Sequence, residues 1–335
     1  MIIDAYSHVC PQRLTEAINR EFPSAEAAAL DSKPYLRDAS MRVRFMDEMG
    51  IDVQALVLVR PPMWLGMPRE VMYRMMREAH LGIAAMVAEF PDRFVGAAVA
   101  PTCDDMVLEE LTFAWDELGL VGAEIFSNVE ELPLDTAAMW PLYQEAERRH
   151  MPLWIHPQHT SCLYPWIKES LLDRSLAWPF DTSLAMMRLV YGGVMERFPE
   201  LRIVTHHLGG MIPYFGARLD AFDKEIAEYR SQQLTGGQVV DLPRPVGHYL
   251  RRFYNDTAIS YSPATLRCGL DYFGPEKVMF GTDFPMGSAD GEAWTRDILR
   301  AIGDTAMPDS DRQLLLGGNA ARLLGLGDRA YRSRA

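Results

Sequence analysis

The chain has 335 residues, 48% of them hydrophobic and 24% charged, which is enough for one large domain or two ordinary ones with a sizeable core. Its 33 lysines and arginines face 46 aspartates and glutamates, giving a formal charge of −13. This charge repels nucleic acid and anionic lipid, so neither is expected as a partner. The four cysteines form no Cys-x-x-Cys pair, and no run of about 18 apolar residues occurs. The sequence therefore predicts a cytoplasmic protein without a membrane span.

Short apolar runs bounded by turn signals recur along the chain. They predict strands at 1–8, 53–59, 94–100, 122–127, 152–157, 202–207, 253–258 and 278–283. Helix-like segments separate them at 41–50, 69–90, 104–118, 136–150, 182–198, 213–229, 263–272 and 292–302. Near-continuous apolar strands are typical of a parallel sheet buried on both faces. The order predicts an α/β fold of the (β/α)₈ TIM barrel type, with an open doubly wound sheet as the alternative.

The connections between these elements are uneven in length. We expect a single domain over 1–326, closed by a helix at 310–326, and a C-terminal tail at 327–335. Long insertions are expected at 10–40, 158–180 and 230–250. Links of this length in a compact domain are usually lids or contacts with a partner subunit.

Four polar side chains end predicted strands. His8 follows the first strand, His156 the fifth, His207 the sixth and Asp283 the eighth. The carboxyl ends of barrel strands form one face, so these residues should converge there. Two imidazoles and a carboxylate are typical of a catalytic divalent metal with positions open for water or substrate. Taken singly, each histidine could equally be a structural polar residue.

The other histidines are interpreted as structural or surface residues. His206 neighbours His207 on the same predicted strand, and alternation should turn it to the opposite side. The remaining four lie in predicted helices or loops: His80, His150, His159 and His248.

Five motifs are spread along the chain: "IDAYSHVCP", "LWIHP", "THHLGGMIPYFGARLD", "NDTA" and "VMFGTDFP". In these motifs the chain resembles the aminocarboxymuconate-semialdehyde decarboxylase family, in the amidohydrolase 2 branch of the amidohydrolase superfamily. The motifs extend over nearly the whole chain. The resemblance implies a TIM barrel of the metal-dependent hydrolase type.

The resemblance also implies roles for individual residues. His8 matches the second histidine of the family's His-x-His pair, a metal ligand, and His156 and Asp283 match two further ligands. His207 matches the histidine that acts as general base. Arg218 falls where members of the family place an arginine that reaches the site of a neighbouring subunit, which implies a homodimer.

Tyr6 stands where the family has the first histidine of the pair. Three interpretations are open. The tyrosine is itself a ligand, since a dication favours the phenolate; or it hydrogen-bonds a bound water or substrate while three residues hold the metal; or the metal site is lost. Intact residues at the other ligand positions favour a bound divalent metal, with Zn²⁺ expected and Mn²⁺ or Fe as alternatives.

Two further residues are interpreted as substrate-binding. Arg60 follows the second strand and could pair with a substrate carboxylate, although an exposed loop arginine is the alternative. Trp178 precedes the sixth helix, where the resemblance suggests an aromatic facing the substrate and core packing is the alternative.

We expect a metal-dependent decarboxylase acting on a small aromatic or unsaturated carboxylic acid, with His207 moving protons and Asp283 passing one to the carbon that loses CO₂. One alternative is a hydrolase or hydratase of the same fold, acting on a lactone, an amide, a C–C bond or an alkene. Another is a non-catalytic barrel with a decayed metal site. The ligand set does not separate these chemistries.

Overall fold

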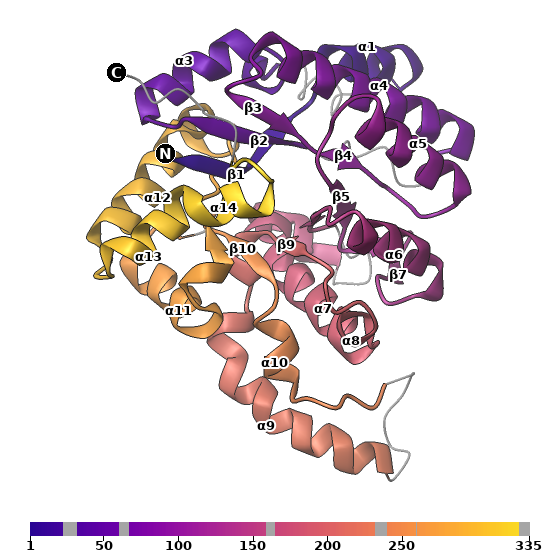
Figure 1. The fold of residues 1–335 in the computed structure, drawn as a ribbon, viewed down its shortest axis with the longest axis vertical. Helices are drawn as coiled ribbons and strands as arrows, with labels where there is room; N and C mark the ends of the chain where they lie inside the picture. The colour runs from indigo at the N-terminus through magenta and orange to yellow at the C-terminus, as the bar shows by residue number, and fades with distance from the viewer. Residues whose placement is uncertain (23–31, 60–66, 159–164, 232–239, 259, 328–335) are drawn as a thin grey trace.

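The computed structural model describes residues 1–22, 32–59, 67–158, 165–231, 240–258 and 260–327 (Figure 1). Within these ranges the barrel strands are β1 (Ile3–Val9), β2 (Val53–Leu58), β3 (Phe94–Gly96), β4 (Ala98–Val99), β5 (Ala123–Phe126), β8 (Leu153–His156), β9 (Ile203–Thr205), β10 (Tyr254–Asp256) and β11 (Val278–Met279). Neighbouring strands pair in parallel. Two further strands, β6 (Asn128–Val129) and β7 (Leu132–Pro133), form an antiparallel hairpin after β5.

The sheet closes on itself. Strands β3 and β4 are two parts of one barrel strand that is interrupted at Ala97, because β3 pairs with β2 and β4 pairs with β5. The last barrel strand and the residues that follow it are joined to β1 by backbone hydrogen bonds. Ala5 N donates to Phe280 O at 2.8 Å, and His8 N donates to Phe284 O at 2.6 Å. The predicted (β/α)₈ barrel is confirmed, since an open doubly wound sheet lacks this closure.

Helices surround the barrel (Figure 1). Those that follow barrel strands are α3 (Ala39–Met49), α4 (Arg69–Glu89), α5 (Asp105–Asp116), α6 (Trp140–Arg148), α7 (Trp178–Tyr191), α8 (Val194–Arg197), α9 (Ile212–Ser231), α11 (Pro263–Phe273) and α12 (Glu292–Asp304). Several begin at polar caps: Asp38 accepts a hydrogen bond from Met41 N at 2.8 Å, and Asp104 accepts one from Val107 N at 3.0 Å. Gly50, with φ of +71°, ends α3.

Two of the long insertions contain helices. The first holds α1 (Gln12–Glu21), whose Leu14, Ala17 and Ile18 are buried and which packs against α4. The third ends in α10 (Val246–Leu250). The expected final helix is divided into α13 (Asp309–Gln313) and α14 (Asn319–Leu323) by a wider helical turn at Leu314–Gly318. The sequence analysis treated both segments as insertions and predicted neither α1 nor α10.

Strand β1 departs from regular pairing beside the site. Between Asp4 and Ser7 it carries one residue more than β2 does, so Ala5 and Tyr6 lie in a β-bulge. The indole of Trp154, fully buried inside the barrel, donates a hydrogen bond to Ala5 O at 3.1 Å. This bond fixes the bulge from within the barrel.

The helix pair α9 and α10 lies at one end of the molecule, away from α3 and α4 (Figure 1). Among the described residues, we find no helix that is both long and apolar enough to pass through a membrane.

Candidate metal centre

Five polar residues, which we call the cluster, lie at the carboxyl ends of the barrel strands. His8 is the last but one residue of β1, His156 is the last of β8, and His206 and His207 directly follow β9. Asp283 follows β11. All five residues are at most 7% exposed. The structure thus brings together the four residues that the sequence placed on this face.

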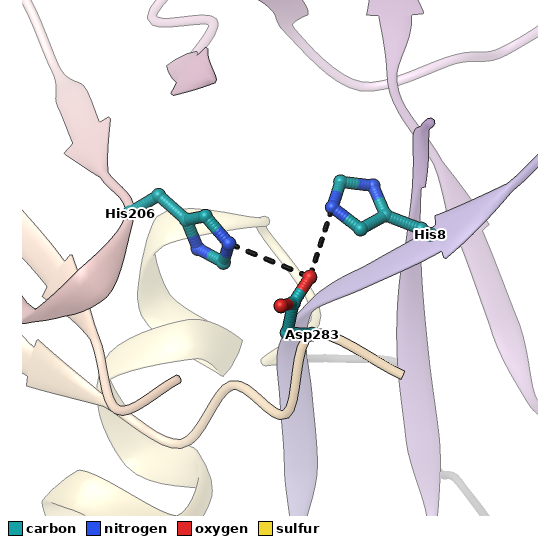
Figure 2. Close-up of side chains that lie close together, drawn as sticks. All are labelled: His8, His206 and Asp283. Carbon is teal, nitrogen blue, oxygen red and sulfur yellow. Dashed lines mark ion pairs between the residues drawn. The ribbon is translucent and has the colours of Figure 1, made fainter. Parts of the chain in front are cut away.

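Asp283 joins two histidines. Its Oδ1 lies 3.1 Å from His8 Nε2 and 3.5 Å from His206 Nε2 (Figure 2). Burial alone would raise the pKa of this carboxyl, but the two imidazoles outweigh it and hold the pKa well below the ordinary value of 3.8. Asp283 is therefore a carboxylate, the form that binds cations.

His156 has a fixed tautomer. Its Nδ1 lies 2.7 Å from the carbonyl oxygen of Pro157, which can only accept, so Nδ1 carries the proton and donates. Burial lowers the pKa of His156 well below 6.5, and His8 and His206 lower it further. A neutral ring with its Nδ1 engaged leaves Nε2 as a lone-pair donor, the usual arrangement of a metal-binding histidine.

The orientation of His206 differs from the one predicted from the sequence. Alternation predicted that it would point away from His207, but β9 ends at Thr205 and the period of two stops there. Its Nδ1 lies 2.5 Å from Asp256 Oδ2 and its Nε2 faces Asp283. Burial lowers the pKa of His206, yet Asp256 and Asp283 outweigh it and raise the pKa to about 10. His206 belongs to the cluster as a charged ring between two carboxylates.

His207 lies against His206, with ring centroids 3.8 Å apart. Its backbone N donates to Asp256 Oδ1 at 3.1 Å, so Asp256 supports the site through hydrogen bonds to both His206 and His207. His207 Nδ1 is buried without a hydrogen-bond partner among the described residues, and burial lowers the pKa of the ring well below 6.5. Both His207 (φ +58°) and Asp283 (φ +63°) have left-handed backbones, which cost about 1–3 kcal/mol each and concentrate at functional sites.

Tyr6 is enclosed beneath these residues. Its ring stacks on His206 with centroids 4.0 Å apart and 15° between the planes, and meets His8 edge-on at 5.4 Å. The hydroxyl is buried and has no hydrogen-bond partner in the part of the chain that the structure describes. Burial raises the pKa of the phenol well above 10, and the carboxylates of Glu124, Asp256 and Asp283 raise it further.

Two groups of potential metal-binding atoms share His8. One comprises His8, His206 and Asp283, and the other comprises His8, Glu124 and His156; within each group the donor atoms lie within 4.8 Å of one another. Glu124 was missed by the sequence analysis. The signal was present, because Glu124 is the only charged residue of the apolar run "GAEIFS".

The cluster fits a divalent cation. Carboxylate oxygens and imidazole nitrogens are its ordinary donors. Several polar atoms here are deeply buried, and Tyr6 Oη and His8 Nδ1 have no hydrogen-bond partner within the described ranges. Unpaired buried polar atoms are costly, so they indicate a site that is completed by a further group.

The residues predicted to bind substrate lie at different positions relative to the cluster. Trp178 begins α7, and its ring lies 5.9 Å from that of His156 at an angle of 70°. Arg218 lies on α9, is exposed, and covers the ring of Phe222 at 4.6 Å, so within its own chain it does not reach the cluster. Arg60 lies outside the described residues.

A family model described as amidohydrolase matches residues 3–326. The chain belongs to the amidohydrolase family. Among curated proteins, this amidohydrolase is 28% identical over 301 residues to 2-amino-3-carboxymuconate-6-semialdehyde decarboxylase of Dictyostelium discoideum, covering 88% of this chain and 78% of the relative. It is 28% identical over 322 residues to gamma-resorcylate decarboxylase of Polaromonas sp., covering 92% of each.

Solved structures agree with the amidohydrolase barrel. The crystal structure of 5-carboxyvanillate decarboxylase from Sphingomonas paucimobilis matches with a TM-score of 0.82 and 25% identity, covering 97% of this chain and 98% of the other. Dihydroxybenzoic acid decarboxylase from Polaromonas sp., solved with bound manganese and 2-nitroresorcinol, matches with a TM-score of 0.79 and 24% identity over 99% of each chain. The resemblance stated from the motifs is confirmed.

The amidohydrolase freed of metal should lose stability as the pH rises above neutrality. The pKa of His206 is about 10 in the fold against 6.5 for a free imidazole, so its contribution is full below about pH 6.5 and is lost as the pH approaches 10. The slope is at most about 1.4 kcal/mol per pH unit for one proton. Urea unfolding of chelator-treated protein between pH 7 and 10 measures it.

The substitution His206→Asn should flatten this dependence. His248→Asn, which removes an exposed histidine of α10, is the control and should keep the wild-type slope. Parallel curves for the wild type and H206N would contradict the charged state of His206.

Proposed function

We propose that the chain is a metal-dependent decarboxylase that acts on an aromatic or unsaturated carboxylic acid. The observation that carries the proposal is the convergence of His8, His156 and Asp283 at the carboxyl ends of the barrel strands, in a chain whose relatives are decarboxylases. Active sites of (β/α)₈ enzymes lie at this face.

His8, His156 and Asp283 would hold one divalent metal. When bound, it would act as a Lewis acid toward the oxygens of the substrate. Zinc remains our first candidate because two imidazoles and a carboxylate suit it. Manganese is the second, since a related decarboxylase was solved with manganese bound.

Decarboxylation breaks the bond between the carboxylate and its carbon, releases CO₂, and leaves an electron pair that takes up a proton. His207 can exchange protons with the substrate because burial keeps its ring neutral near pH 7 and its Nδ1 has no partner in the described structure. Asp283 is a carboxylate, so it must first accept a proton, for which the charged ring of His206 at 3.5 Å is a source, before it can pass one to that carbon. The ring of Trp178 offers a flat apolar surface to an aromatic substrate.

We also propose a cytoplasmic homodimer in which Arg218 completes the partner's site. Arg218 is exposed on α9, and the same helix exposes Tyr214, Phe215 and Phe222. An exposed aromatic surface of this kind is typical of a subunit contact. Light scattering should give twice the mass of one chain, and the mass of a single chain would contradict the dimer.

Replacing His207 by alanine should lower kcat by about 10²–10⁴-fold, the usual contribution of a positioned acid–base group. Release of CO₂ from 2,6-dihydroxybenzoate and 5-carboxyvanillate, the substrates of related enzymes, measures turnover. H150A, at an exposed helix end, is the control and should retain activity. Undiminished turnover by H207A would overturn the role of His207, and uptake of ¹⁸O from water without CO₂ would indicate hydrolysis instead.

Removing the metal should abolish turnover. The purified protein is expected to contain about one equivalent of divalent metal, because three protein ligands suit one catalytic ion. Elemental analysis before and after chelation, followed by activity assays with added Zn²⁺ or Mn²⁺, identifies the ion. Full activity in protein with less than about a tenth of an equivalent would argue against a metal-dependent mechanism.

A further inference from the structure

Glu124 is a buried carboxylate that the proposed mechanism does not use. It lies on β5 in register with Trp154 of β8, which fills the barrel interior, so Glu124 also points inward. Its neighbours in the strand, Ala123 and Ile125, face the outer core between barrel and helices. The side chain is 0% exposed. Burying a carboxylate in this way is costly unless a cation or hydrogen-bond donors compensate.

The position of Glu124 is suited to ligation. Its carboxylate oxygen and the ring nitrogens of His8 and His156 lie within 4.8 Å of one another. Donors bound to one divalent ion at about 2.0–2.2 Å lie at most about 4.4 Å apart. Small side-chain rotations are therefore enough to bring these three donors to one ion. The proton on His156 Nδ1 is already engaged by Pro157, which leaves Nε2 available.

The contacts of Tyr6 hold its ring in a position that does not favour metal ligation. Its ring lies flat on His206, 4.0 Å away, and a phenol is longer than an imidazole from the same backbone position. The bulge that contains Tyr6 is fixed by the hydrogen bond from Trp154 to Ala5 O, and Tyr6 O accepts hydrogen bonds from the backbone of Thr282 and Asp283. Moving the ring toward the ion would disturb its stacking on His206, because buried side chains are close-packed.

The charges of the buried side chains also favour a cation beside Glu124. Three fully or nearly fully buried carboxylates, of Glu124, Asp256 and Asp283, lie near the ring of Tyr6. The charged ring of His206 lies between Asp256 and Asp283, so Glu124 is a further negative charge beside the cluster that a cation would offset. A divalent ion between Glu124 and Asp283 would offset both of the carboxylates that line the site.

We propose that Glu124, and not Tyr6, is the fourth protein ligand of the metal, together with His8, His156 and Asp283. This inference rests on the metal dependence proposed above. The resulting set of two imidazoles and two carboxylates supplies ligands from β1, β5, β8 and the segment that follows β11. Its second carboxylate moves the preference toward harder ions such as Mn²⁺.

Mn²⁺ binding to chelator-treated protein tests the proposal without reference to activity. Titration calorimetry should find one site in the wild type. Glu124→Gln should weaken binding at least 10-fold, because even substitutions of residues that support a ligand cost 10–100-fold. Tyr6→Phe should bind within about threefold of the wild type, since it removes no ligand. Glu110→Gln is the matched control: Glu110 is also a buried glutamate paired with a histidine, His80, but it lies on α5 outside the cluster.

A thermal melt of each variant separates ligation from folding. Mn²⁺ should raise the Tm of the wild type, Y6F and E110Q through linkage, and should raise that of E124Q much less. If E124Q does not fold, Glu124→Asp decides the matter, because a shortened carboxylate should weaken Mn²⁺ binding and unchanged affinity would contradict ligation.

Two results would overturn the inference while leaving metal dependence intact. One is wild-type affinity in E124Q, and the other is a loss in Y6F as large as that in E124Q. Failure of the wild type to bind Mn²⁺, Zn²⁺ or Fe²⁺ would overturn both the inference and the proposed metal-dependent function.

Discussion

The closure of the barrel between its first and last strands determines the relative position of the residues in the candidate site. Tyr6 O accepts hydrogen bonds from the backbone N of Thr282, at 3.3 Å, and of Asp283, at 3.1 Å, and His8 N donates to Phe284 O. These bonds hold His8 and Asp283 side by side, and the 3.1 Å contact between their side chains follows from them. Without the closure, the residues at either end of the chain would have no fixed relation.

A buried polar network supports this closure from below. Asp4 accepts hydrogen bonds from Thr282 Oγ1 at 2.6 Å and from Gln54 Nε2 at 2.9 Å. Arg42, fully buried, donates to Gln54 Oε1 at 3.0 Å and to His8 O at 2.7 Å. Burial raises the pKa of Asp4 to about 6, although its hydrogen bonds lower it. Such a network specifies one arrangement of β1, because each member is satisfied only when the others are in place.

Much of the fold, and part of the site, could be predicted from sequence. Apolar runs and their polar ends are local signals, and they located His8, His156, His207 and Asp283 on one face. Glu124 gave a local signal, a single charge within an apolar run, but its place beside His8 depends on the closure of the barrel. His206 was missed because alternation fails once β9 has ended, and the bulge at Tyr6 was hidden because a shift in strand pairing leaves no local pattern.

The bond between Asp4 and Thr282 joins residues 278 positions apart. During synthesis at about 5–20 residues per second, His8 leaves the ribosome roughly a quarter of a minute to a minute before Asp283. Over that interval the nascent chain holds only part of the candidate site, and any ion captured early would meet an incomplete set of ligands. The complete set exists only once Asp283 has been synthesised and the first and last barrel strands have paired.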